Sequence, residues 1–172
     1  MIRPTHDEYF LAIAGVVATR ATCLRRAAGC VLVDARGHVL ATGYNGRPSG
    51  CPHCNELTRC VPLGQSDQAI PAKLIDTWPH VCAGVLIDGK LVASGTNLDA
   101  CEAIHAEQNA LLQCSNIYNI ETCYVTVSPC LTCVKLLLNT NCKRVVFAIP
   151  YAHDEIASRL WTAGGRIWKL VK

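Results

Sequence analysis

Charged and aromatic side chains are both scarce in this chain of 172 residues. Asp, Glu, Lys and Arg together make up 17% of it and Phe, Trp and Tyr 6%, whereas 51% of the residues are hydrophobic. A disordered protein has the opposite balance, with much charge and few apolar residues, so the composition excludes disorder and predicts a compact fold. The 16 basic and 13 acidic residues are mixed along the sequence without a basic run. We therefore expect a small-molecule partner rather than a nucleic acid.

Long apolar runs are lacking as well. The apolar stretch over residues 10–18 is too short to span a bilayer and has no context for signal-peptide cleavage. We therefore expect no membrane association and a cytoplasmic location. Cysteine, in contrast, is abundant, with 12 residues. In a reducing compartment these thiols are expected in metal sites and in the core rather than in disulfides.

Hydrophobic periodicity predicts the first elements of the fold. An amphipathic helix begins near Asp7, with Thr5 or Asp7 as its cap. A buried hairpin is expected over residues 29–43 and a second one over residues 83–95, because Asp88-Gly89 is a strong turn signal. Residues 51–80 show no periodicity and are expected to form a loop.

Helices and strands then alternate to the end of the sequence. The expected helices begin at His105, Cys130 and Asp154, and the expected strands cover residues 122–127, 144–149 and 166–171. Such alternation predicts an α/β fold with a mixed sheet and helices on both faces. We expect a single domain over residues 1–172, with the loop and the inserted hairpin at about residues 51–100.

A metal-binding pattern is the strongest chemical signal in the sequence. It consists of His105-Ala106-Glu107 and, further on, Pro129-Cys130-Leu131-Thr132-Cys133. Cys130 and Cys133 are three residues apart at the start of an expected helix, so both sulfurs can reach one ion. A structural zinc has four protein ligands, whereas three ligands beside a carboxylate leave a position for water and provide a base. His105, Cys130 and Cys133 are thus the expected zinc ligands and Glu107 the catalytic residue, although a structural zinc site is the alternative. H-x-E followed by P-C-x-x-C is the signature of zinc-dependent nucleobase deaminases.

The sequence further resembles the deoxycytidylate (dCMP) deaminase family, its bacterial and phage branch in particular. The resemblance covers most of the chain except roughly residues 61–100. The blocks that carry it are Glu8-Tyr9-Phe10-Leu11, Thr19-Arg20-Ala21-Thr22-Cys23, Gly43-Tyr44-Asn45-Gly46, Pro52-His53-Cys54, His105-Ala106-Glu107-Gln108-Asn109-Ala110 and Ser128-Pro129-Cys130-Leu131-Thr132-Cys133.

This resemblance implies a fold and a reaction. The fold is a three-layer α/β/α sandwich of the cytidine-deaminase type, with a five-stranded sheet. The reaction converts dCMP and water to dUMP and ammonia, which feeds dTMP synthesis. In it Glu107 first takes a proton from water and then protonates N3 and the leaving amine. The alternative is the same chemistry on another cytosine compound: a C5-modified dCMP, a nucleoside, a free base or a base in nucleic acid. A non-catalytic zinc module is a third class.

The resemblance also implies which residues contact the substrate. Asn45 matches an asparagine that binds the deoxyribose, although an asparagine in a turn is the simpler interpretation. The Thr126-Val127-Ser128 backbone matches the segment that holds the cytosine edge. Guanidinium groups suit phosphate oxygens, so three arginines are candidates for the 5′-phosphate, although most single arginines are merely solvated. They are Arg25, Arg26 and Arg47. Tyr151 is a candidate substrate neighbour, with the core as its alternative position.

A second, structural zinc is implied by further cysteines that match the family. The expected ligands are Cys23, Cys54, Cys60 and Cys101, and the candidates to replace one of them are Cys51, His53 and Cys82. Four thiolates would close a tetrahedral site and order the long loop. Buried free thiols are the alternative for these positions. The remaining cysteines fall on apolar faces and are expected in the core: Cys30, Cys114, Cys123 and Cys142.

The chain also departs from the family pattern. A hairpin is inserted before His105, and Glu102 stands where relatives have an arginine. The resemblance implies a homo-oligomer, a hexamer or another dimer-based assembly. It also implies regulation by dCTP and dTTP, with Mg²⁺, through residues 44–46, and the host cytoplasm as the location if a phage encodes the protein.

Overall fold

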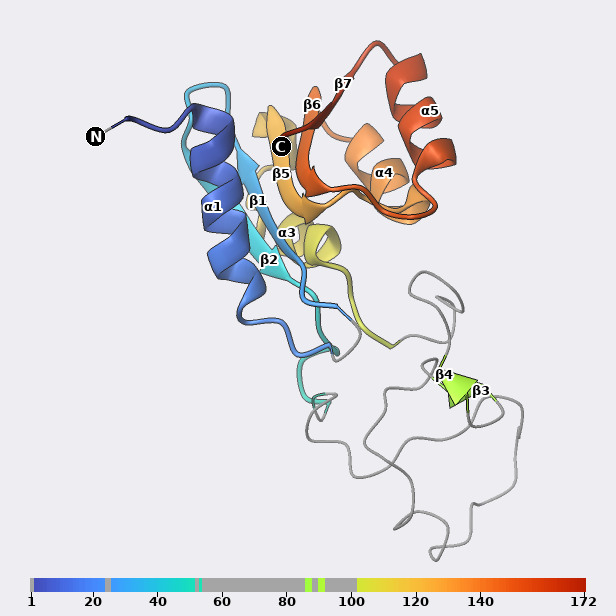
Figure 1. Ribbon diagram of the computed structural model, residues 1–172. Helices are drawn as coiled ribbons and strands as arrows, with labels where there is room; N and C mark the ends of the chain where they lie inside the picture. The colour runs from blue at the N-terminus through green and yellow to red at the C-terminus, as the bar shows by residue number, and fades with distance from the viewer. Residues whose placement is uncertain (1, 24–25, 52, 54–85, 88–89, 92–101) are drawn as a thin grey trace, which may run out of the picture. The chain divides into compact units, whose positions relative to one another are not determined.

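The computed structural model describes residues 2–23, 26–51, 53, 86–87, 90–91 and 102–172 (Figure 1). Its backbone divides into two compact units. The first comprises residues 1–21, 28–45 and 105–172, and the second residues 22–27 and 46–104. That residues 1–172 form a single domain stays a prediction. No described helix is long and apolar enough to cross a membrane.

The first unit is built on a five-stranded mixed sheet with the strand order β2-β1-β5-β6-β7. Antiparallel pairing joins β1 to β2 and to β5, while β5, β6 and β7 are parallel. The strands are β1 (Gly29–Val33), β2 (Val39–Tyr44), β5 (Thr122–Val127), β6 (Arg144–Ile149) and β7 (Ile167–Leu170). This sheet confirms the mixed α/β architecture expected from the sequence.

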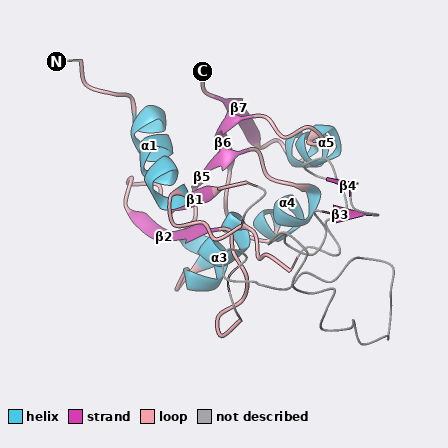
Figure 2. Ribbon diagram, turned by 60° about the horizontal axis from the view of Figure 1, so that its bottom comes forward, coloured by secondary structure: helices cyan, strands magenta, loops and turns pink. Residues whose placement is uncertain are grey.

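Helices cover both faces of this sheet (Figures 1 and 2). One face packs against α1 (His6–Ala18), where Phe10 and Ala14 meet Val31 and Tyr124. The opposite face packs against three helices of the described part of the chain, α3 (Ala106–Gln113), α4 (Leu131–Leu138) and α5 (Glu155–Ala163). A short 3-10 helix, η2 (Ile117–Asn119), precedes β5. The result is the three-layer α/β/α sandwich.

Local signals explain where α1 begins. Thr5 is its N-cap: its Oγ1 accepts a hydrogen bond from the Glu8 N–H at 3.3 Å, and the Glu8 carboxylate accepts one from the Thr5 N–H at 2.7 Å. This reciprocal pair satisfies two donors that a helix start leaves open. Of the two caps considered from the sequence, the structure thus selects Thr5.

The second unit contains a two-stranded antiparallel pair, β3 (Leu86–Ile87) and β4 (Lys90–Leu91). This pair confirms the antiparallel pairing that the sequence predicts within the inserted hairpin. The rest of that hairpin, expected over residues 83–95, and the loop expected over residues 54–80 lie outside the described residues. Residues 46 and 104 of the same unit also pair, through backbone hydrogen bonds of 3.1 and 2.8 Å between Gly46 and Ile104.

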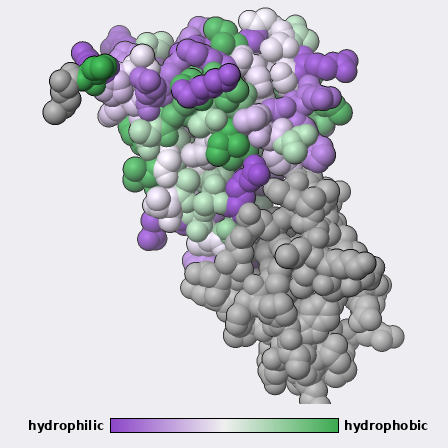
Figure 3. Space-filling model, in the orientation of Figure 1, coloured by the Kyte–Doolittle hydropathy of each residue, from purple (hydrophilic) through white to green (hydrophobic). Residues whose placement is uncertain are grey.

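The surface of the first unit mixes polar and apolar side chains on the face seen in Figure 3. Large apolar residues that are exposed come from several elements, among them Tyr9, Val16, Leu112, Ile149, Ile156 and Ile167.

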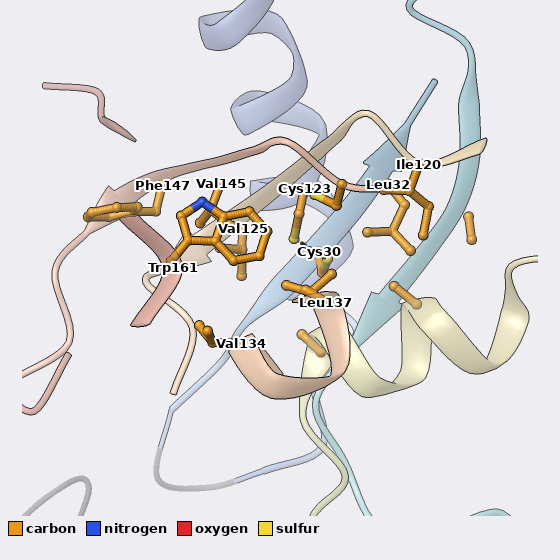
Figure 4. Packing of buried hydrophobic residues seen from close by; sticks show 14 of the residues in the cluster. Cys30, Leu32, Ile120, Cys123, Val125, Val134, Leu137, Val145, Phe147 and Trp161 are labelled. Carbon is orange, nitrogen blue, oxygen red and sulfur yellow. Dashed lines mark hydrogen bonds between the residues drawn. The ribbon is translucent and has the colours of Figure 1, made fainter. Parts of the chain in front are cut away.

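The main core lies between the sheet and the helices α3, α4 and α5. Apolar residues of β1, β5 and β6 meet Leu137 of α4 and Trp161 of α5 there (Figure 4). Cys30, Cys123 and Cys142 are fully buried among them, and Cys114 is partly buried against them. These positions confirm the expectation that the four cysteines pack as small apolar residues.

A charged cluster lies beneath α1 on the other face of the sheet. The Asp7 carboxylate accepts hydrogen bonds from the Tyr124 hydroxyl at 2.9 Å, from Lys169 Nζ at 2.7 Å and from an Arg144 guanidinium nitrogen at 3.1 Å. Burial raises the pKa of Asp7, but the hydrogen bonds from Lys169 and Tyr124 and the charge of Arg144 outweigh it, so the pKa lies below 3.8. Asp7 thus provides the counter-charge that Arg144 and Lys169 share.

We expect the Asp7→Asn substitution to lower the free energy of unfolding by about 2 kcal/mol, because it leaves Arg144 and Lys169 without a counter-charge. The loss stays below that for a fully buried pair, since these two side chains are 30% and 49% exposed. Because folding lowers the pKa of Asp7, its contribution is complete above the unfolded value and disappears as the pH falls through the folded one. Urea unfolding from neutral pH to about pH 3 measures both effects.

Glu121→Gln is the matched control for this substitution. It removes a carboxylate from an exposed ion pair with Lys143, at 2.9 Å, and should change stability by less than about 1 kcal/mol. Equal losses in the two variants, or a loss for Asp7→Asn that persists undiminished in acid, would contradict the assigned role of Asp7.

Candidate metal centre

Helix α3 carries the first residues of the site and lies directly on β2. Gly43 of β2 makes this possible, because a Cβ there would lie 2.3 Å from the Ala106 carbonyl oxygen and 2.3 Å from the Ala110 nitrogen. The Asn109 side chain adds a hydrogen bond from its Nδ2 to the Tyr44 carbonyl oxygen, at 2.7 Å. At the N-cap position, the His105 N–H donates to Gln108 Oε1 at 2.8 Å. These contacts fix the start of α3, and with it His105 and Glu107.

Helix α4 carries the two sulfur ligands. Cys130 is its N-cap residue, and Cys133 lies on its first turn and is fully buried. Pro129 precedes them and is fully buried too. The spacing of three residues places both sulfurs on the same side of the helix start, as the sequence predicts. Because β5 ends at Val127, the helix begins at the carboxyl edge of the sheet, where open α/β sheets bind ligands.

The two helix starts bring three metal-ligating atoms together. His105 Nδ1 lies 3.3 Å from Cys130 Sγ and 3.4 Å from Cys133 Sγ, and the ligand atoms of the group all lie within 4.8 Å of one another. In a tetrahedral zinc site with Zn–N and Zn–S bonds of roughly 2.0 and 2.3 Å, neighbouring ligand atoms are roughly 3.5 Å apart. The group therefore fits zinc. Among the residues that the structure describes, it contains these three ligands and no fourth.

The Cys130 thiol has the acidity that a ligand needs. A hydrogen bond from Cys133 and another from His105 lower the pKa of Cys130 to about 4, against the effect of burial. The hydrogen bond to Cys130 and burial raise the pKa of Cys133. One thiolate thus forms readily, and metal binding has to displace the proton of the other thiol.

Glu107 lies next to these ligands and is buried, with 5% of its surface exposed. Burial raises its pKa from 4.5 to about 7, although the neighbouring His105 and a hydrogen bond from Cys133 act in the opposite direction. A carboxyl group of this kind exists in both protonation states near neutral pH. It can therefore accept a proton and give it back in one reaction.

The structure places other predicted site residues at the same edge of the sheet. Asn45 follows β2, and its Oδ1 accepts a hydrogen bond from the Ala28 N–H at 2.7 Å. Thr126 Oγ1 accepts one from the Gly29 N–H at 3.2 Å. Ser128 is buried, and its Oγ accepts one from the half-buried Tyr151 at 2.6 Å. Val127, between Thr126 and Ser128, is buried.

The remaining predicted residues fall outside this unit. Arg26, Arg47 and Cys23 belong to the second unit, where Arg26 is exposed and Arg47 pairs with Glu102. Cys51 and His53 are described in the second unit too. Four predicted residues lie outside the described part of the chain, and so does one candidate replacement: Arg25, Cys54, Cys60, Cys101 and, as the replacement, Cys82.

Two residues with a part in the site were not singled out from the sequence. Asn109 fixes α3 on β2 through the Tyr44 carbonyl, and Asp154 accepts a hydrogen bond from the Ser128 hydroxyl at 2.6 Å. Asn109 belongs to the block His105-Ala106-Glu107-Gln108-Asn109-Ala110, so its position in that motif could have indicated a part in the site. Asp154 carried no such signal, because an aspartate at a helix start predicts a cap.

Comparisons with known proteins agree with this geometry. Residues 4–149 match a family model described as the cytidine and deoxycytidylate deaminase zinc-binding region. The deoxycytidylate deaminase of Mycobacterium phage D29 is 36% identical over 148 residues, which cover 86% of this chain and 97% of that protein. The deoxycytidylate deaminase of Schizosaccharomyces pombe is 34% identical over 168 residues, or 95% of this chain. This chain spans only 43% of the length of the fission yeast protein.

A solved structure supports the fold. The dCMP deaminase of cyanophage S-TIM5, crystallised in complex with dCMP and dUMP, superimposes with a TM-score of 0.62 at 23% sequence identity. The match covers 99% of this chain and 100% of that one. It confirms the three-layer sandwich that the sequence predicts.

Proposed function

Because this chain belongs to the cytidine and deoxycytidylate deaminase zinc-binding family, we propose that it hydrolyses dCMP to dUMP and ammonia, a step that feeds dTMP synthesis. The observation that carries this proposal is the group of His105, Cys130 and Cys133 with the buried Glu107 beside it. Three ligands and a neighbouring proton carrier are what hydrolytic deamination needs, whereas a structural zinc needs four ligands.

The metal ligands and Glu107 have different roles in the proposed reaction. When zinc is bound by the three ligands, it activates a water molecule as a nucleophile. Glu107 accepts one proton from the water molecule at its carboxylate and passes it to N3 of the cytosine ring. It then accepts the second proton, from the hydroxyl group added to C4, and passes that one to the leaving amine. Its buried position beside the metal-ligating group supports both roles. The burial of Glu107 and Cys133 keeps bulk water away from this exchange.

The substrate contacts are proposals that rest on the family resemblance. Asn45 binds the deoxyribose, and the Ala28 N–H supports this by holding the Asn45 amide in one orientation. The backbone of residues 126–128 binds the cytosine edge, and Tyr151 lies beside the nucleotide. The 5′-phosphate is bound by arginines, with Arg25, Arg26 and Arg47 as candidates. Arg47 already pairs with Glu102, so a phosphate has to compete with that carboxylate.

A substrate panel tests the proposed reaction. We expect ammonia release from dCMP, with much slower release from CMP, deoxycytidine and cytosine. Chelation should abolish turnover, and added zinc should restore it. If a C5-modified dCMP, a nucleoside, a free base or single-stranded DNA were deaminated faster than dCMP, that compound would be the substrate instead of dCMP. Zinc binding without deamination of any cytosine compound would instead support a non-catalytic zinc module.

We further propose a second, structural zinc bound by Cys23, Cys54, Cys60 and Cys101. Cys23 supports it as a free and partly exposed thiol in the second unit. Metal analysis should then give two zinc ions per chain, and Cys23→Ser should remove one of them while the ion at His105 remains. One zinc per chain in the unaltered protein would contradict this site.

Assembly, regulation and location complete the proposal. Apolar side chains exposed on β6 and α5, such as Ile149 and Ile156, support a homo-oligomer, whose mass light scattering measures. Regulation by dCTP and dTTP with Mg²⁺ rests on residues 44–46, and assays with each nucleotide test it. The eight described cysteines are all free, which supports a cytoplasmic location.

A further inference from the structure

The buried hydroxyl of Ser128 joins two loops at the carboxyl edge of the sheet. Ser128 directly follows β5 and is separated from the ligand Cys130 only by Pro129. Its Oγ donates a hydrogen bond to Asp154 Oδ2 at 2.6 Å and accepts one from the Tyr151 N–H at 2.6 Å. The Ser128 N–H donates to the Ile149 carbonyl oxygen at 2.9 Å. The segment that follows β6 is thereby tied to the segment that leads to the metal ligands.

The Asp154 side chain accepts one of these hydrogen bonds instead of capping a helix. Asp154 occupies the N-cap position of α5, where an aspartate side chain normally accepts a hydrogen bond from the first turn and stabilises the helix. Here the Asp154 side chain makes no such bond, and its backbone is helical, with φ −89° and ψ −1°, instead of extended. Its carboxylate makes a short, charge-assisted bond with the Ser128 hydroxyl. The Asp154 side chain therefore serves the bond to Ser128 and not the cap of α5.

The hydrogen bond between Ser128 and Asp154 holds residues 150–154, which follow β6, next to the segment that leads to the metal ligands. Strands β5 and β6 run parallel, with Val127 paired to Ile149, so the residues after both strands emerge at one edge. Cys130 lies in the first of these segments and Tyr151 in the second. Tyr151 is half-buried, and its ring meets the His153 ring edge-on, with centroids 6.0 Å apart and planes at 83°. The hydrogen bond to Ser128 thus holds the backbone of Tyr151 beside the segment that leads to Cys130, and the His153 ring restricts the Tyr151 side chain.

We infer that Ser128 and Asp154 are positioning residues that fix the backbone of residues 150–154 and thereby hold Tyr151 against the bound nucleotide. This inference rests on the proposed function and adds two side chains that act through Tyr151. A side chain such as Tyr151 that lies against the substrate contacts it in the ground state and in the transition state alike. Displacement of this side chain therefore raises KM more than it lowers kcat. Loss of a residue that acts on the metal or on Glu107 would have the opposite pattern.

Steady-state kinetics of Asp154 variants test the inference. Asp154→Ala should raise KM for dCMP about tenfold while kcat stays within about twofold, which corresponds to the loss of one charge-assisted hydrogen bond. Asp154→Asn keeps an acceptor oxygen, so its KM should lie between those of Asp154→Ala and the unaltered enzyme. The zinc content should not change in either variant. Ser158→Ala, one helical turn further along α5, is the matched control and should behave as the unaltered enzyme.

A second measurement needs no substrate. In Ser128→Ala the Tyr151 amide loses its acceptor, so its hydrogen exchange should accelerate at least about tenfold while the exchange of α1 is unaffected. An unaccelerated Tyr151 amide would overturn the inference whatever the substrate is. An unchanged KM in Asp154→Ala, or a zinc content that falls in parallel with activity, would overturn it as well. Failure of the unaltered protein to deaminate any cytosine compound would instead refute the proposed function, and hydrogen exchange would still decide whether Ser128 holds the loop.

Discussion

The Glu107→Gln enzyme is expected to bind zinc normally and to deaminate dCMP about a thousandfold more slowly, the usual contribution of a positioned acid or base. An amide has nearly the shape of a carboxyl group, so the packing around this buried side chain should persist. The amide, however, neither accepts nor releases a proton near neutral pH, so no group carries the protons to N3 and to the leaving amine. The measurement is kcat with dCMP, alongside the zinc content of the same sample.

Glu121→Gln serves as the control for this substitution, since it makes the same chemical change at a carboxylate paired with Lys143 on the surface. It should keep full activity. If Glu107→Gln deaminated dCMP at the rate of the unaltered enzyme, Glu107 would not be the proton carrier. If the variant lost its zinc, the burial of Glu107 would serve the metal site rather than proton transfer.

The metal centre was predictable because its residues form two groups, each of them close in sequence, and the spacing within each group has local consequences. Cys130 and Cys133 meet through the geometry of one helical turn, and Pro129 indicates where that turn begins. His105 and Glu107 similarly belong to one helix start. The alternation of helices and strands then predicts that both helix starts lie at one edge of the sheet. Short-range rules thus account for all three ligands and for Glu107.

Contacts between distant segments were not predictable in this way. Ser128 and Asp154 are far apart in sequence, and only the parallel pairing of β5 with β6 brings them together. The contact of Gly43 with α3 depends on the register of β2 and on how closely the helix approaches it. The order of residue types along the sequence gives neither the strand register nor the distance between a helix and a strand. The roles of Arg26, Arg47 and Cys23 stay predictions for a related reason, since they depend on how loops fold rather than on helix or strand periodicity.

The close approach of α3 to β2 makes Gly43 a position where one added methyl group should disturb the metal centre. In Gly43→Ala the new Cβ would lie 2.3 Å from the Ala106 carbonyl oxygen and 2.3 Å from the Ala110 nitrogen, both in the α3 backbone. Because these atoms cannot rotate away, α3 has to shift together with His105 and Glu107. We expect a loss of about 3 kcal/mol in the free energy of unfolding and at least about a tenfold loss in zinc affinity.

Gly29 provides the matched control on the opposite face of the same strand pair. In Gly29→Ala the Cβ would lie 2.1 Å from the Ala14 carbonyl oxygen and 2.5 Å from the Ala18 nitrogen, so it displaces α1, which carries no metal ligand. This variant should lose a similar amount of stability and keep its zinc affinity. Gly15→Ala should lose neither, because no atom within 4 Å of the new Cβ comes from another part of the fold. Zinc titration and urea unfolding of the three variants separate the two effects. Equal zinc affinity in Gly43→Ala and Gly29→Ala would show that the position of α3 on β2 does not control the metal centre.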